Sequence, residues 1–134
     1  MNFVFISPHF PRTYWNFCDR LKRKGVNVLG IGDASYDSLD QNVRNSLTEY
    51  YFVGNMENYD DMYRAVAFYA SKYGRIDWIE SNNEYWPERD ARLRTDFNVN
   101  TGINRRQAFD TGSGKRMLLC LCQPERRQTI CTYP

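Results

Sequence analysis

The polar residues that could bind a substrate stand where short apolar runs of the sequence end. The apolar run Trp78-Ile79 ends in Glu80. A carboxylate there could accept hydrogen bonds from an amine or a sugar hydroxyl of a bound molecule. Apolar runs earlier in the chain end in the same way, and together these run ends supply five candidate substrate-binding residues: Ser7, His9, Asp33, Glu80 and Asn83.

Most of the candidates also have a purely structural explanation. Asn83 could cap the helix that Pro87 is expected to start, because asparagine is a preferred N-cap residue. Glu80 lies too early for that role, so a substrate contact and a structural role both remain open for it. Asp33 is of a type common in turns, and His9 could simply pack within its loop.

The sequence offers no metal site. His9 is the only histidine, and no cysteine lies at ligand spacing from it. Three cysteines near the end form a C-x-C and a distant third position, whereas structural zinc sites prefer two C-x2–4-C pairs. We therefore expect no metal ion, and we assign no catalytic residue.

Two nucleotide-binding motifs are incomplete. GIGDAS (30–35) has glycines and an acid, but a dinucleotide site needs its phosphate-binding turn after the first strand, where SPHFPR contains no glycine. TGSGKR (111–116) lacks the first glycine of a P-loop and has arginine where serine or threonine is required. The chain is expected to hold no cofactor by itself.

The elements that must hold the five candidates are alternating strands and helices. Apolar runs predict parallel strands buried on both faces at 2–7, 26–32, 50–53 and 76–80. Helical spacing of apolar residues predicts helices that start near Pro11, at about 38 and after Asn58, and Pro87 starts a fourth. This alternation predicts an α/β fold, a Rossmann-like parallel sheet of four or five strands in the order 3-2-1-4 with helices on both faces.

Such a sheet would bring the candidates to one edge, because ligands bind beyond the carboxyl ends of parallel strands. Strands 1 and 4 are neighbours in the predicted order, so Glu80 should lie within reach of the His9 loop. We expect Glu80 to face an open crevice that keeps its carboxylate solvated. Trp78 and Ile79 should both be buried, on opposite faces of the sheet.

Composition divides the chain near residue 103. The 134 residues carry 18 Lys and Arg against 16 Asp and Glu, but the basic excess lies in the last segment, which is rich in arginine pairs and cysteine. We expect a Rossmann-like domain at 1–103 and an atypical basic, cysteine-containing tail at 104–134. The arginine pairs could touch phosphates, but a solvated tail is favoured over nucleic-acid binding.

The location of the protein is expected to be cytoplasmic. No apolar run approaches the roughly 18–20 residues that span a bilayer. The first residues, MNFVFISP, begin a strand directly and do not have the pattern of a signal peptide. No membrane association is expected.

Three segments of residues 1–103 resemble a known family when taken in order: NFVFISPHFPRTYWNFCDRLKRKGVNVLGIGD, TEYYFV and IDWIESNNEYWPERDARLRTDFNVNTGI. They resemble the amino-terminal, pre-ATP-grasp domain of ATP-grasp ligases, the superfamily of biotin carboxylase and the carboxylate–amine ligases. In that family, ATP and magnesium are held by the catalytic lobes that follow. The resemblance implies that this domain packs on those lobes and that its strand ends, here Glu80 and the His9 loop, help hold an amine-type acceptor.

The resemblance stops at Ile103, and the remaining residues do not look like the ATP-binding lobe. We therefore expect a domain that is inactive alone, from a truncated or frame-shifted gene. Its partner would be a catalytic ATP-grasp lobe or a small-molecule substrate, and homo-oligomerisation is left open. The alternative is a free-standing Rossmann-like module with a basic tail that binds a small metabolite or docks on a partner.

Overall fold

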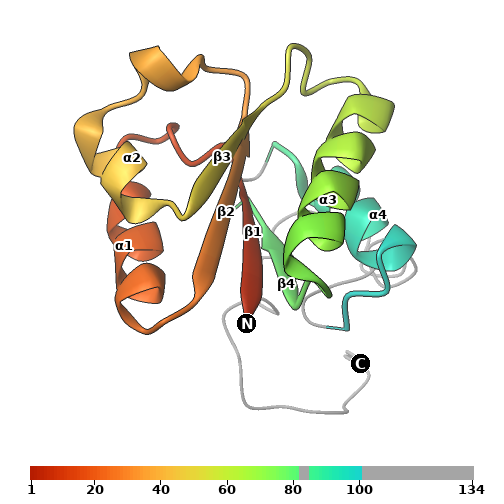
Figure 1. Cartoon of the computed structure of the whole chain (residues 1–134). Helices are drawn as coiled ribbons and strands as arrows, with labels where there is room; N and C mark the ends of the chain where they lie inside the picture. Colours follow the sequence, from red (N-terminus) through yellow and green to blue (C-terminus); the bar gives the residue numbers. More distant parts are fainter. Residues whose placement is uncertain (82–84, 101–134) are drawn as a thin grey trace, which may run out of the picture.

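Strands and helices alternate along the chain (Figure 1). The computed structural model describes residues 1–81 and 85–100. The strands are β1 (Asn2–Ile6), β2 (Asn27–Gly32), β3 (Glu49–Phe52) and β4 (Trp78–Glu80). The helices are α1 (Trp15–Arg23), α2 (Gln41–Ser46), α3 (Tyr59–Tyr73) and α4 (Pro87–Asp96), with a short 3-10 helix at Tyr36–Ser38. Each of the predicted strands and helices is present.

The four strands form one parallel sheet in the order β3-β2-β1-β4, which confirms the predicted topology. β1 lies in the interior of the sheet, where Val4 is paired with Leu29 of β2 on one side and Ile79 of β4 on the other. All five residues of β1 are buried. This explains why its sequence is a continuous apolar run, since both of its faces are covered.

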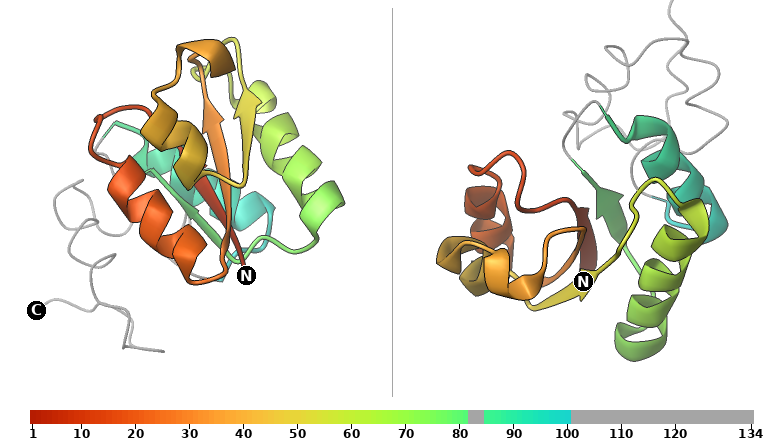
Figure 2. Two further views of the ribbon diagram at one scale, coloured as in Figure 1. Left: turned by 60° about the vertical axis from the view of Figure 1, so that its left-hand side comes forward. Right: turned by 90° about the horizontal axis from the view of Figure 1, so that it is seen from above.

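Helices cover both faces of the sheet, α1 and α2 on one face and α3 and α4 on the other (Figure 2). Alternate residues of the strands therefore enter two separate cores. The residues of β1 illustrate this, because Val4 packs in the core under α3 and α4 and Phe5 in the core under α1 and α2. The continuous apolar runs of the sequence predicted that the strands would be buried on both faces.

The two residues before Glu80 confirm the alternation but not the full burial that was predicted. Ile79 is buried in the core under α3 and α4. Trp78 lies on the opposite face and stacks on Phe3, with ring centroids 6.1 Å apart. The indole is only half-buried, because within the part of the chain that the structure describes β4 forms an edge of the sheet.

The start of α1 differs from the prediction. Pro11 does not open the helix, which begins at Trp15. Ser7, with φ 58, turns the chain out of β1, and the backbone N–H of Tyr14 then bonds to the carbonyl of Pro11 at 3.1 Å. The residues between β1 and α1 are therefore a loop over the end of the sheet, long enough to place His9 above β2.

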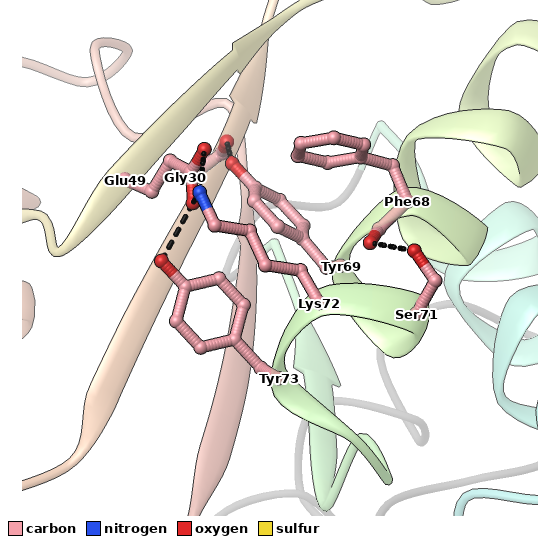
Figure 3. A network of polar contacts seen from close by, with 7 residues as sticks. All are labelled: Gly30, Glu49, Phe68, Tyr69, Ser71, Lys72 and Tyr73. Carbon is pink, nitrogen blue, oxygen red and sulfur yellow. Dashed lines mark hydrogen bonds and ion pairs between the residues drawn. The ribbon is translucent and has the colours of Figure 1, made fainter.

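Helix α3 has the two ends that the sequence predicted. The Asn58 side chain accepts a hydrogen bond from the backbone of Asp60, and Gly74 follows the last turn with φ 87. The last turns of α3 are held to the sheet by polar contacts (Figure 3). Lys72 Nζ lies 2.8 Å from a carboxylate oxygen of Glu49 in β3. The Tyr73 hydroxyl donates to the same carboxylate at 2.6 Å, and the Tyr69 hydroxyl donates to the carbonyl of Gly30 at 2.6 Å.

Among the helices within residues 1–81 and 85–100, none has the length and apolar character that crossing a membrane requires.

Candidate functional site

The candidate residues lie where the strands end, at the carboxyl edge of the sheet, and they separate into two groups. Ser7, His9 and Asp33 follow β1 and β2, and Glu80 ends β4. Asn83, the fifth candidate, lies outside the described residues, as does the tail at 104–134 with its cysteines.

The first group is built around a contact between the side chains of two loops. His9 Nε2 lies 3.2 Å from Asp33 Oδ1. Ser7 fixes the loop that carries His9, because its backbone N–H bonds to the carbonyl of Ile31 at 2.7 Å and its positive φ reverses the chain. The His9 side chain is 23% exposed and that of Asp33 is 55% exposed, so the carboxylate is the group that water or a ligand can reach.

Gly32 allows this group to form. A Cβ at this position would lie 3.0 Å from Nδ1 of His9 and 2.6 Å from the hydroxyl of Tyr50. Both side chains therefore approach the backbone of β2 closely, and Tyr50 donates to the carbonyl of Ala34 at 2.6 Å. Within the described residues, Nδ1 of His9 is buried without a hydrogen-bond partner.

Tyr50 belongs to this group, although the sequence analysis did not single it out. Burial, together with the nearby Asp33 carboxylate, raises the pKa of Tyr50 to about 12, so its hydroxyl remains a donor at neutral pH. The glycine that ends an apolar run was the available signal, because a strand-end glycine often marks a close approach of other groups.

Glu80 is not solvated, which corrects the expectation from the sequence. It is 5% exposed. Its Oε2 lies 3.0 Å from Nη2 of Arg94, which is itself 1% exposed, and Nε of Arg94 donates to the carbonyl of Ile79 at 2.8 Å. The reason is that α4 packs back across the end of β4 and places its arginine over the carboxylate. Glu80 is therefore a buried acid that joins a strand to a helix.

Ser81 and Asp90 extend this arrangement. The backbone N–H of Ser81 donates to Oε1 of Glu80 at 3.1 Å, and its hydroxyl donates to Oδ2 of Asp90 at 2.6 Å. Asp90 is fully enclosed, and this burial is the main reason why its pKa is raised to about 7. We call Glu80, Ser81, Asp90 and Arg94 the buried polar cluster.

The structure brings His9 and Asp33 together but does not join them to Glu80. Tyr14, at the end of the loop that carries His9, is close enough to Glu80 for the carboxylate to raise its pKa, after the larger effect of burial. The two groups thus lie on neighbouring strands, and the loop between β1 and α1 runs past both. The predicted strand order is right.

A hollow of about 390 Å³ lies beyond β3 and β4 and is lined by residues that the sequence analysis did not select: Glu57, Tyr85, Trp86, Pro87, Glu88 and Arg89. Arg89 and Tyr85 both contact Glu57, at 2.9 and 3.0 Å. The Arg89 guanidinium also lies 5.0 Å from the centroid of the Trp86 ring. The hollow therefore has aromatic walls and a paired charge.

The carboxyl edge also carries exposed aromatic side chains. One stands at the end of each of the four strands or in the segment that follows it, and each is more than half exposed. We call these four residues the edge rings: Phe10, Tyr36, Phe52 and Tyr85. Together with Asp33 they give this edge exposed rings beside an accessible carboxylate.

A metal centre is not formed within residues 1–81 and 85–100, where no three His, Cys, Asp or Glu side chains gather closely enough to hold an ion. The strand-end groups are therefore suited to binding through hydrogen bonds, ion pairs and aromatic contacts.

No protein-family model matches the chain, and a search of curated proteins found no significant relative.

Proposed function

We propose that the chain is the amino-terminal domain of an ATP-grasp-type ligase. Such a ligase activates a carboxylate with ATP, and an amine-type acceptor then attacks it. In this role the domain packs on the catalytic lobes that carry ATP and magnesium, helps hold the acceptor, and is inactive alone. The resemblance of residues 1–103 to that family supports the proposal, as does the parallel sheet in the order 3-2-1-4.

The edge rings are the observation that carries the proposal. Half of the exposed large apolar side chains of the described residues belong to this one edge of the sheet. Exposed apolar groups gathered on one face mark surfaces that contact another molecule. A catalytic lobe packed on the carboxyl edge would cover the rings and leave the polar groups between them facing the shared cleft.

Asp33 is the group at this edge best suited to the acceptor. Its carboxylate is more than half exposed, and the contact with His9 fixes its position. A fixed carboxylate can accept hydrogen bonds from an amine and orient it. Glu80 does not take this role in the proposal, because Arg94 covers its carboxylate.

The test begins with the genomic DNA downstream of the coding sequence. We expect that DNA to encode ATP-grasp lobes, in the same or another reading frame. Expressed separately, those lobes should bind the full chain in calorimetry. Phe52→Ser should weaken binding at least tenfold, because an interface ring is often a main source of affinity.

The matched control is Phe68→Ser on α3. Phe68 is also partly exposed, but it lies on α3, where its ring packs on Tyr51, and it is not one of the edge rings, so its removal should leave binding unchanged. The proposal fails if no reading frame encodes such lobes. It also fails if the lobes bind and the two variants behave alike.

A free-standing module that binds a small metabolite is the second candidate, and the hollow beside Tyr85 and Trp86 favours it. A metabolite bound there would shift the NMR signals of both rings in a mixture of amines and amino acids. Tyr85→Ala should then abolish the shifts at Trp86. Shifts of this kind without any binding to ATP-grasp lobes would select this candidate.

A further inference from the structure

Asp90 is an acid in an environment that does not suit its ionised form. It lies on α4 and is 2% exposed. Oδ2 accepts a hydrogen bond from the Ser81 hydroxyl at 2.6 Å, whereas Oδ1 is buried and has no hydrogen-bond partner in the part of the chain that the structure describes. Keeping an ionised oxygen away from water without a hydrogen-bond donor costs much more free energy than keeping a protonated oxygen there.

Among the residues that the structure describes, the charged groups that face Asp90 are one guanidinium and one carboxylate. Arg94 comes from its own helix and Glu80 from β4. Arg94 favours the ionised form, but its guanidinium is already bonded to Glu80 and to the carbonyl of Ile79. Glu80 opposes ionisation by repulsion. Burial is the largest effect, and it outweighs Arg94 and the hydrogen bonds from Ser81, which lower the pKa, so that the pKa of Asp90 is raised to about 7.

Asp90 also holds both ends of the connection between β4 and α4. Its side chain binds Ser81, the residue directly after β4. Its backbone N–H donates to the carbonyl of Trp86, the residue before α4, at 2.9 Å. A change at Asp90 therefore acts on the part of the carboxyl edge that carries Tyr85 and Trp86.

We propose that the enclosed carboxyl of Asp90 is a proton-binding site of the folded chain, and that its proton controls how the end of β4 is attached to α4. With the proton on Oδ1, the acid is neutral and Oδ2 keeps the bond from Ser81. When the proton leaves to water, the ionised carboxylate needs further donors, so it turns toward water or admits water. The bond from Ser81 favours the ionised form and is kept, but the unpartnered Oδ1 must then gain water, so the packing of α4 against the end of β4 loosens.

The direction of the effect on folding follows from the raised pKa. The native chain binds this proton more tightly than the unfolded chain, in which the usual value is 3.8. The contribution to stability is therefore complete below that value and is lost as the pH rises through about 7. The titration is a property of this chain alone, whereas its role in docking the catalytic lobes rests on the proposed function.

The direct test is NMR of the full chain with ¹³C-labelled aspartate. The Asp90 carboxyl signal, identified by its loss in Asp90→Asn, should titrate with a midpoint near 7. The backbone signals of Ser81 and Trp86 should move with the same midpoint, and in Asp90→Asn they should not. A midpoint below about 5, or Ser81 and Trp86 signals that ignore the Asp90 transition, would overturn the proposal.

Urea unfolding at several pH values gives an independent measurement. The folding equilibrium constant of the natural chain, relative to that of Asp90→Asn, should fall roughly tenfold for each pH unit between about 5 and 7. Asp60→Asn, which changes an exposed acid at the start of α3, serves as the control. The folding equilibrium constant of the natural chain relative to that of Asp60→Asn gives the pH dependence expected when an unrelated acid is removed. If the stability of the natural chain and that of Asp90→Asn depend on pH in the same way, Asp90 does not bind the proposed proton. This conclusion holds whether or not the catalytic lobes bind the chain.

Discussion

Asp33 and Glu80 show how similar residues at similar places acquire different roles. Both are acids at the carboxyl ends of parallel strands, and the sequence was sufficient to identify both positions. Asp33 is more than half exposed, whereas Glu80 is covered by Arg94. This difference could not be predicted from the strand alone, because it depends on a helix that begins several residues later and on which of its side chains crosses the strand end.

The first prediction concerns that buried ion pair. Glu80→Gln should lower the free energy of unfolding by about 3 kcal/mol, because it leaves the Arg94 charge buried beside a neutral amide. Urea unfolding at pH 7 measures the change. Glu88→Gln, an exposed acid on the same helix, should change the free energy by less than about 0.5 kcal/mol. A loss below about 1 kcal/mol for Glu80→Gln would mean that water reaches the pair and offsets the missing charge.

At the scale of elements, the sequence predicted the strands and α3 better than the loops. Continuous apolar runs and helix-end residues such as Asn58 and Gly74 are local signals, and the structure confirms both. The path from Ser7 to Tyr14 is different, because it is fixed by contacts with β2 and β3. No local sequence pattern near His9 predicts that its ring will pack against Gly32 and beside Tyr50.

Gly32→Ala tests that contact between elements. The new methyl group would meet the Tyr50 hydroxyl and the His9 ring, and neither can move without breaking a hydrogen bond or an ion pair. We expect a loss of about 1–3 kcal/mol in unfolding free energy, as is usual for overpacking, and a shift of the His9 and Asp33 NMR signals. Gly54→Ala is the matched control, since a methyl group there meets nothing within 4 Å. Equal effects of the two variants would show that the loop adapts freely.

At the scale of the whole molecule, the described residues before 101 already form both cores, and Val99 is the last of them in the core under α3 and α4. The sheet order followed from the right-handed crossover rule and from the alternation of elements, which is why the sequence could predict it. The boundary near residue 103, in contrast, was inferred from composition and lies outside the described residues.

A chain that ends at residue 103 should therefore fold as well as the full chain. Because the sheet, its four helices and both cores lie before this point, we expect the free energy of unfolding to change by less than about 1 kcal/mol. Urea unfolding of the two chains side by side measures it. Aggregation of the shorter chain, or a much lower midpoint, would place the tail within the folded core.

The chain should neither hydrolyse ATP nor bind it tightly. In the proposed family the phosphate-binding lysine and the magnesium carboxylates belong to the catalytic lobes, which residues 104–134 do not resemble. Calorimetric titration with ATP and magnesium should give no saturable heat in the micromolar range. Binding at a 1:1 ratio with micromolar affinity would contradict the prediction and redirect attention to the carboxyl edge of this chain.

The interior position of β1 has a consequence for the synthesis of the protein. β1 leaves the ribosome well before its neighbour β4, because Asn2 and its partner Asp77 are 75 positions apart in the sequence. At roughly 5–20 residues per second, translation of that interval takes about 4–15 seconds. Throughout this time the edge of β1 that will receive β4 has no strand to bind, and its apolar side chains are only partly covered. The nascent chain is thus a natural client for chaperones that shield apolar segments at the ribosome.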